Sequence, residues 1–315
     1  MVAARRRAVG FGIRTPLVRL PVEGPAEIHL KLECLQPIGS FKLRGAGNAV
    51  ALADPAALSR GVCTASAGNM AQGLAWNARR LGVPCTVVVP DHAPRAKLEA
   101  VERLGARIVK VPVERWWRVL EEHGYPGVEG LFVHPVADRA VIAGNGTIGL
   151  EILEDLPDVD AVLVPWGGGG LSCGIAAALR ALRPETRVYA CEVDTAAPLS
   201  ASLAAGRPVE VAYTPSFVDG IGARGLLPEM WPMAKELLAG SIVVSLEETK
   251  AALRLLVTRA HVVAEGAGAV PVAAALSGRA GGGKLVAVVS GGNIDPEKLA
   301  AILAETPLPA GEGHR

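Results

Sequence analysis

The chain has 315 residues, of which 50% are hydrophobic, 20% are charged and 4% are aromatic, and its formal net charge is +1. This length suits two lobes of moderate size, and the near-neutral charge gives no electrostatic basis for binding nucleic acid or an anionic membrane. No apolar stretch approaches the ~18 residues of a membrane span, and the basic run at residues 5–7 lacks the apolar segment of a signal peptide. We expect that run to be a solvated terminus.

Cysteine and histidine usage gives no sign of a disulfide framework or a metal site. The five cysteines are scattered, odd in number and without a CxxC pair, and the six histidines show no HExxH spacing. We therefore expect buried thiols, no bound metal and a cytoplasmic, reducing location.

Short apolar runs alternate with helical patterns along the chain, which is typical of parallel sheets with crossover helices. The predicted strands are 17–20, 28–33, 62–66, 85–90, 107–112, 131–135, 161–166, 188–193, 242–246 and 285–290. One helix is predicted to begin at Lys42. The other predicted helices cover 69–81, 95–104, 114–123, 138–155, 171–182, 228–239, 247–260 and 296–305. The tail after Thr306, rich in proline and glycine, is expected to be loose.

These elements predict an α/β fold with two open, mostly parallel sheets and helices on both faces. No linker divides the chain, so we expect a small lobe at residues 52–140 inserted into a large lobe formed by 1–51 and 141–315. A ligand is expected to bind between the two lobes.

Lys42 lies in the segment SFKLRGAGN at residues 40–48, between Phe41 and Leu43, where a helix is predicted to begin. A lysine in a partly apolar site can lose its proton near neutral pH and attack a carbonyl. Considered alone, the position is more typical of a solvated lysine in a first helical turn. Three glycine-containing turns further along the chain favour the functional interpretation.

The strongest anion-binding signal is PWGGGGL at 165–171, which follows an apolar strand and opens an amphipathic helix. The candidate residues of this turn are Gly167, Gly168, Gly169, Gly170 and Leu171. Successive glycines let backbone N–H groups converge, and the helix N-terminus adds a positive dipole that suits a phosphate.

Two further loops also end predicted strands. Ser290 begins SGGN at the end of a buried strand, where it can hydrogen-bond without bringing charge. The loop Ser66-Ala67-Gly68-Asn69 could hold a carboxylate with its N–H groups and the Ser66 hydroxyl, and Asn69 could bond a ring hydroxyl.

Two GxGxxG matches at 144–149 and 220–225 raise a distant alternative, a nucleotide-dependent oxidoreductase. Neither follows a clear strand, so the dinucleotide fingerprint fails on context. A P-loop-like spacing at 278–284 precedes its strand and has Leu285 where a magnesium-binding hydroxyl is needed.

The four motifs SFKxRGA, SAGN, GGGGL and SGGN, in this order and spacing, together resemble the pyridoxal-phosphate enzymes of fold type II (tryptophan synthase β-like). Within that family the chain is most similar to the serine/threonine dehydratase and serine racemase branch, from Arg14 to Ser290. The resemblance implies pyridoxal 5′-phosphate as cofactor, an amino acid as substrate and a homodimeric assembly.

The resemblance also assigns roles to individual residues. It implies that Lys42, next to Phe41, holds the cofactor as a Schiff base and removes the α-proton, and that the 167–171 turn cradles the phosphate. It places Asn69 at the 3′ oxygen, Ser290 at the pyridine nitrogen and Glu265 near the cofactor. The loop Ser66, Ala67, Gly68 and Asn69 is implied to bind the substrate carboxylate.

Because Ser290 is neutral, fewer types of reaction are expected at the cofactor. A serine cannot keep the pyridine nitrogen protonated as a carboxylate would, so the ring is a weaker electron sink and a carbanion is short-lived. This favours prompt loss of a β-substituent, and we expect a β-hydroxy amino acid such as L-serine or L-threonine to give a 2-oxo acid and ammonia.

Single positions separate this reading from its alternatives, a racemase or a β-replacement synthase of the same fold. Family synthases usually carry aspartate at the position of Leu43, and racemases place a second serine at the position of Ala67. Because alanine cannot move a proton, racemisation is disfavoured. Which β-hydroxy amino acid is preferred is left open.

The chain departs from the family pattern at several places. Met70 replaces a histidine, Trp166 a small apolar residue and Asn145 a glutamine, and the short segment before Arg14 raises the expectation that the family's leading helix is missing. At the family's cation site, Glu192 and Ala196 match but Pro198 replaces the second carboxylate, so cation binding is expected to be weak at best.

Overall fold

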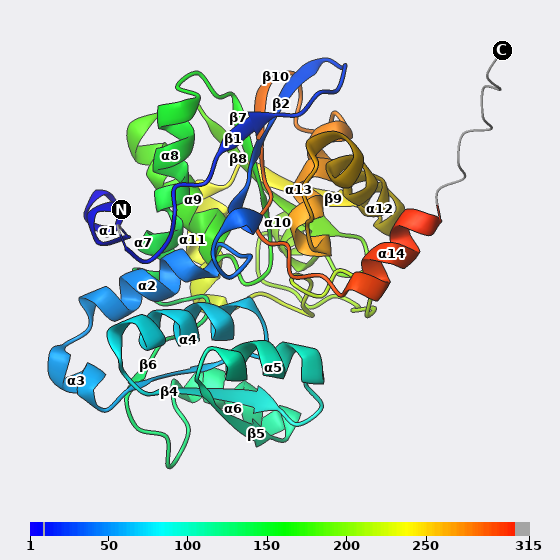
Figure 1. The fold of residues 1–315 in the computed structure, drawn as a ribbon. Helices are drawn as coiled ribbons and strands as arrows, with labels where there is room; N and C mark the ends of the chain where they lie inside the picture. The colour runs from blue at the N-terminus through cyan, green and yellow to red at the C-terminus, as the bar shows by residue number, and fades with distance from the viewer. Residues whose placement is uncertain (9, 306–315) are drawn as a thin grey trace.

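Two β-sheets organise the computed structural model, which describes residues 1–8 and 10–305 (Figure 1). The six-stranded sheet has the order β1 (Leu17–Arg19), β2 (Ala26–Lys31), β10 (Gly283–Val288), β7 (Ala161–Pro165), β8 (Arg187–Val193) and β9 (Gly240–Val244). The four-stranded sheet has the order β5 (Arg107–Val111), β4 (Cys85–Pro90), β3 (Val62–Ala65) and β6 (Leu131–Phe132). All pairings are parallel except that of β1 with β2, which confirms the predicted fold class.

The helices fall into two groups around these sheets (Figure 1). Around the smaller sheet lie α3 (Pro55–Ser59), α4 (Asn69–Leu81), α5 (Arg95–Arg103) and α6 (Val113–Glu122). The other helices are α1 (Val2–Ala8), α7 (Arg139–Asn145), α8 (Thr147–Asp155), α9 (Gly170–Leu182), α10 (Pro198–Ala205), α11 (Trp231–Leu237), α12 (Leu246–Leu255), α13 (Gly266–Leu276) and α14 (Pro296–Ala304). Helix α2 (Lys42–Leu52) packs against both α4 and α7 and so joins the two groups.

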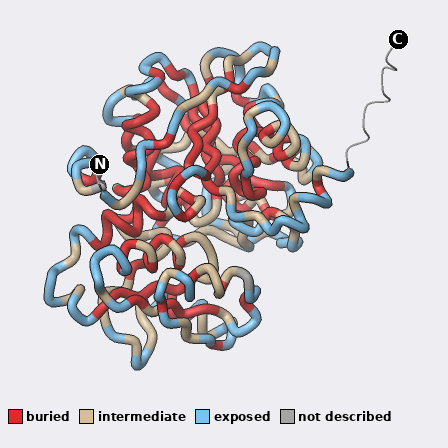
Figure 2. The backbone as a smooth tube through the Cα atoms, in the orientation of Figure 1, coloured by how far each residue is buried: buried red, intermediate tan, exposed pale blue. Residues whose placement is uncertain are grey.

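The central strands of the larger sheet are buried and contribute to the hydrophobic core (Figure 2). Every residue of β7 is buried, and so are the last four residues of β10. Because helices cover both faces of parallel strands, such strands are continuous apolar runs without alternation. These runs end at the same edge of the sheet, and the residues that follow them line the functional site.

The helix predicted over 138–155 is two helices, α7 and α8, separated at Gly146. A Cβ on Gly146 would lie 2.6 Å from the Gly174 carbonyl oxygen, so the absence of a side chain at Gly146 allows the close approach to α9. Strand β6 is shorter than predicted because a turn begins at His134, whose ring accepts hydrogen bonds from the backbone. Helix α13 has no predicted counterpart: it is apolar on all sides, so it lacks the amphipathic period that predicts a helix.

The N-terminal expectation was wrong. Residues 2–8 form α1, in which Ala4 is buried, so a leading helix is present. Of the three arginines expected to be solvated, Arg6 is exposed, whereas Arg5 pairs with Glu154 and the Arg7 side chain donates to Asn48 at 2.8 Å. These contacts connect α1 to α8 and to α2.

The lobe boundaries at residues 52 and 140 stay a prediction, although all strands of the smaller sheet lie between residues 62 and 132. All five cysteines are buried and free. Within residues 1–8 and 10–305, no helix is long and apolar enough to cross a membrane. The tail after Thr306 lies outside the described residues.

Candidate active site

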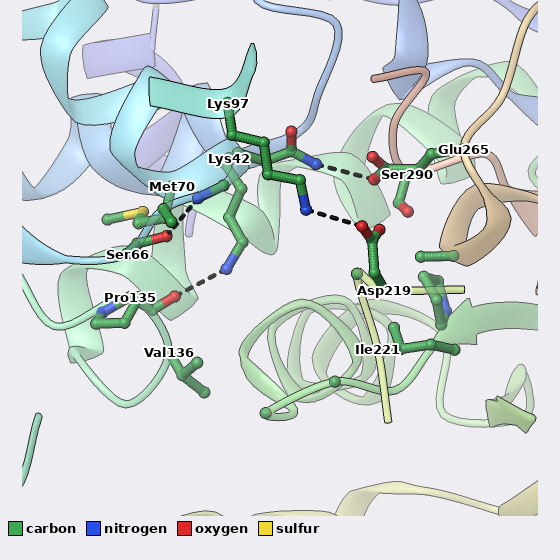
Figure 3. Close-up of a pocket in the computed structure, with 18 of the residues that line it drawn as sticks. Lys42, Ser66, Met70, Lys97, Pro135, Val136, Asp219, Ile221, Glu265 and Ser290 are labelled. Atoms are coloured by element: carbon green, nitrogen blue, oxygen red, sulfur yellow. Dashed lines mark hydrogen bonds and ion pairs between the residues drawn. The ribbon is translucent and has the colours of Figure 1, made fainter. Parts of the chain in front are cut away.

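A cavity of about 360 Å³ lies where the carboxyl ends of strands from both sheets meet (Figure 3). All of the site residues predicted from the sequence line it: Phe41, Lys42, Ser66, Ala67, Gly68, Asn69, Gly167, Gly168, Gly169, Gly170, Leu171, Glu265 and Ser290. The fold thus brings together segments as far apart in the sequence as Phe41 and Ser290. Their individual roles stay predictions.

Lys42 is the first residue of α2, and its amine points into the cavity (Figure 3). The Nζ atom donates a hydrogen bond to the carbonyl oxygen of Pro135 at 2.9 Å. Burial lowers the pKa of Lys42 to about 8, and the nearby carboxylate of Glu265 opposes this shift only in part. A substantial share of the amine is therefore neutral near physiological pH, as a nucleophile or proton acceptor requires.

Ser290 is held close to the start of α2 by the backbone. The Phe41 N–H donates to the Ser290 carbonyl at 3.0 Å, and Ser40 forms an isolated bridge with Gly291. Ser290 itself is buried at the end of β10 and lines the cavity. Ser290 therefore contributes a neutral hydroxyl to the site, and its implied role at a pyridine nitrogen stays a prediction.

The glycine turn leads from β7 into α9, and three of its four glycines are required for steric reasons. A Cβ on Gly168 would lie 2.6 Å from the Val136 side chain, and one on Gly170 would lie 2.6 Å from the Val136 carbonyl oxygen. Gly169 has φ +97°, and a Cβ there would meet the buried ring of Trp166 at 2.5 Å. Trp166, the departure noted in the sequence, thus forms the floor beneath the turn.

These features fit the phosphate and the carbonyl group of the expected cofactor. The start of α9 has no side-chain cap, and its first residues, Gly170 and Leu171, line the cavity. A helix N-terminus of this kind favours an anion. The amine of Lys42 and the hydroxyl of Ser290 line the same cavity, so the residues suited to an aldehyde, a phosphate and a ring nitrogen share one site.

Asn69, the first residue of α4, links two other side chains by hydrogen bonds. The Asn69 side chain donates to Glu265 Oε1 at 2.8 Å and accepts from the Asn293 side chain at 2.8 Å. Burial raises the pKa of Glu265 to about 7, although the hydrogen bond from Asn69 opposes this rise. Glu265 is thus a carboxyl group that titrates near neutral pH within the cavity.

Some lining residues were not identified from the sequence. Lys97 of α5 and Asp219 form an ion pair of 2.8 Å beside the cavity (Figure 3). Pro135, which accepts the Lys42 hydrogen bond, was also missed. No motif marks these residues, since their importance comes from contacts between distant segments.

Outside the cavity lining, four charged side chains form a buried network that includes Arg44 of α2. Arg44, two residues after Lys42, pairs with Glu33 at 2.7 Å and with Glu151 at 2.6 Å. Lys31 pairs with the second oxygen of Glu151 at 2.6 Å. All four are less than 9% exposed, so the two positive and two negative charges compensate one another without help from water.

The look-alike motifs have the unsuitable context that the sequence indicated. Residues 144–149 span the end of α7 and the start of α8, and residues 220–225 form no helix or strand. The 278–284 segment leads into β10, which begins at Gly283. Glu192 accepts hydrogen bonds from the backbone of Leu199 and Ser200, at the start of α10, and from Ser241. Among the described residues no cluster of three His, Cys, Asp or Glu side chains suits a metal, and weak cation binding stays a prediction.

Comparison with known proteins identifies relatives across most of the chain. The model of the family described as "Pyridoxal-phosphate dependent enzyme" matches residues 10–291. The L-threonine ammonia-lyase of Thermotoga maritima is 43% identical over 284 residues, which cover 88% of this chain and 70% of the relative.

Solved structures agree with this match. Maize serine racemase superposes with a TM-score of 0.87 at 32% identity, covering 96% of this chain and 95% of the other. The processed form of threonine deaminase isoform 2 from Solanum lycopersicum superposes with a TM-score of 0.87 at 31% identity, covering 97% and 92%.

Proposed function

Because the chain belongs to the family of pyridoxal-phosphate dependent enzymes, we propose that it is an ammonia-lyase for β-hydroxy amino acids. The proposed substrates are L-threonine, L-serine or a related compound, and the products are a 2-oxo acid and ammonia. The observation that carries the proposal is one cavity holding a readily deprotonated Lys42, an uncapped glycine-rich helix start and a neutral Ser290. The ammonia-lyase and deaminase relatives support it.

When bound, the cofactor supplies the electron-withdrawing group that makes the α-hydrogen of an amino acid acidic. The neutral amine of Lys42 is the residue placed to accept that proton. The Cα–H and Cβ–O bonds of the substrate break, and the proton and hydroxyl leave as one water. The resulting enamine rearranges, and hydrolysis of its C–N bond consumes one water and gives a 2-oxo acid and ammonia.

The loop from Ser66 to Asn69 is proposed to hold the substrate carboxylate. Its residues lie at the start of α4 and line the cavity, and the Ser66 hydroxyl accepts a hydrogen bond from the Gly68 N–H at 3.2 Å. This bond folds the loop back on itself. Glu265 would compete with an anionic ligand when ionised, and its raised pKa weakens that competition.

Racemisation of the same substrates is the second candidate, because the structure of a serine racemase superposes on nearly the whole chain. A two-base racemase needs an acid or base on the face opposite the lysine. Ala67 occupies the position where the family's racemases carry a serine, and a methyl group transfers no proton. Elimination is therefore preferred.

The location and assembly are proposals as well. Five buried, free thiols are compatible with a reducing cytoplasm. A homodimer is proposed because the resemblance implies one, and sedimentation of the purified protein would test it.

A panel of β-hydroxy amino acids tests the proposed reaction. Purified enzyme with cofactor is expected to release ammonia and 2-oxo acid in equal amounts from L-threonine or L-serine, and chiral chromatography is expected to detect no D-amino acid. Equal release identifies elimination because racemisation releases neither product. Formation of D-serine without ammonia, or no turnover of any member, would contradict the proposal.

The pH dependence of cofactor uptake tests the state of Lys42. Because only the neutral amine attacks an aldehyde and its pKa is about 8, the uptake rate is expected to rise with pH and to level off above about 8. An unshifted lysine would still be gaining rate near its ordinary pKa of 10.5. Stopped-flow absorbance of apoprotein mixed with cofactor measures this, and a soluble amine corrects for ionisation of the cofactor.

A further inference from the structure

His134 lies behind the cavity wall, in the turn that follows β6. The residue is 4% exposed, and its Nδ1 atom accepts two backbone hydrogen bonds. The donors are the N–H of Val136 at 3.1 Å and the N–H of Ala137 at 2.9 Å. An atom that accepts two hydrogen bonds carries no proton, so the ring is neutral with its proton on Nε2.

The hydrogen bond from the Val136 N–H orients the peptide unit between Pro135 and Val136. The carbonyl oxygen of the same unit accepts the hydrogen bond from Lys42. The carbonyl of Pro135 and the N–H of Val136 belong to the same peptide unit, and no described peptide bond is cis. In a trans unit the N–H and C=O point in opposite directions. Since the N–H points at the imidazole, the Pro135 carbonyl points away from it, and its oxygen receives the Lys42 Nζ at 2.9 Å.

The second bond orients the next peptide plane by the same geometry. With the Ala137 N–H directed at the ring, the Val136 carbonyl is directed away from it. That oxygen lies 2.6 Å from where a Cβ on Gly170 would be, and the Val136 side chain limits Gly168 in the same way. One ring nitrogen therefore orients two peptide planes, one facing Lys42 and the other facing the glycine turn.

We propose that His134 is a positioning residue for Lys42, acting through the carbonyl of Pro135. This inference rests on the role proposed for Lys42 in binding the cofactor and in proton transfer. His134 itself does not line the cavity, so it contributes no proton to the reaction. Its contribution is a fixed acceptor that holds the lysine amine toward the cavity.

The electrostatic surroundings keep this acceptor available. Burial lowers the pKa of His134 to about 4, and the charged and titratable groups that act on it are His123, Glu229, Lys42 and Asp138. At neutral pH the ring is therefore uncharged and Nδ1 remains an acceptor. Glu265 is the other group that acts on the charge of Lys42.

Two variants separate positioning from simple packing. His134→Phe keeps the volume of a ring but removes the acceptor, whereas His134→Asn keeps an oxygen acceptor that can bond N–H groups two and three residues ahead. The primary readout is the pH midpoint of cofactor uptake by apoprotein, which reports the pKa of Lys42 without any amino acid substrate. The secondary readouts are kcat and KM with the substrate that the panel identifies.

In His134→Phe the lysine ammonium loses its oriented acceptor, so the midpoint is expected to fall by about 0.5 pH unit or more. The kcat value is expected to fall about 10- to 100-fold, because the base is displaced, while KM changes little. His134→Asn is expected to restore both. The same midpoint in wild type and His134→Phe, or equal defects in the two variants, would overturn the proposal.

If His134→Phe does not fold, His134→Ala, which removes the acceptor with a smaller side chain, takes its place. A midpoint lowered by about 0.5 pH unit or more then supports the proposal, and the wild-type midpoint overturns it. Cofactor uptake is measured without an amino acid substrate. A failure of the positioning role can therefore be distinguished from a failure of the proposed lyase activity.

Discussion

Replacing Lys42 by alanine is expected to abolish the visible absorption of bound cofactor and to lower kcat/KM by at least about 10³-fold. Lys42 is the amine that points into the cavity beside the glycine turn, and its pKa of about 8 suits proton transfer near neutral pH. The methyl group of alanine can neither bind an aldehyde nor accept a proton. Absorption spectra of the reconstituted protein and initial rates of ammonia release measure both effects.

Lys97→Met provides a matched control, since Lys97 also lines the cavity. Its amine is paired with Asp219 at 2.8 Å, and both side chains are about 40% exposed. This variant is expected to retain the cofactor absorption. A Lys42→Ala protein that kept the absorption and the activity would contradict the assigned role, as would loss of absorption in Lys97→Met alone.

Replacing Arg44 by leucine is expected to lower the free energy of unfolding by about 3–5 kcal/mol. The substitution leaves Glu33 without its charge partner and Glu151 with Lys31 alone, in surroundings from which water is excluded. Uncompensated buried carboxylates are more costly than the lost attraction itself. Urea unfolding followed by circular dichroism measures the change, and it also tests whether α2, which carries Lys42, depends on this network.

Arg14→Leu is the control for the same change of side chain on the surface. Arg14 pairs with Glu154 and Asp155, but its side chain is 44% exposed, so the expected cost is below about 1 kcal/mol. Equal destabilisation by both substitutions would show that burial of the network does not matter.

Acid adds a second test of the network. Burial opposes ionisation of Glu151, yet the hydrogen bonds and charges of Arg44 and Lys31 outweigh it and hold its pKa below the ordinary 4.5. A depressed carboxylate pKa stabilises the fold above the ordinary value, and this contribution is lost as the pH falls through the folded pKa. The stability difference between wild type and Arg44→Leu is therefore expected to shrink below about pH 4.5. A difference that stayed constant in acid would argue against this network.

Most of the fold was predictable because its elements have local signals. The prediction of a helix over 69–81 matches the bounds of α4. The residue after it, Gly82, has φ +67°, and glycine is the usual residue for this left-handed conformation at a helix end. Helix α13 was missed for the opposite reason: buried on all sides and containing Pro271, it has no polar face to mark its period. Helix α1 was misjudged because its arginines bind residues far along the chain.

For the site, the sequence by itself determined which chemical groups are present: the lysine, the glycine turn, the SAGN loop and the terminal serine, with the cofactor that their combination implies. Only the tertiary structure decided that these groups share one cavity, that Pro135 and His134 orient the lysine, and that buried charges support its helix. The physical reason is that motifs and periodicity are local, whereas hydrogen-bond partners and burial depend on segments that meet only when the chain is folded.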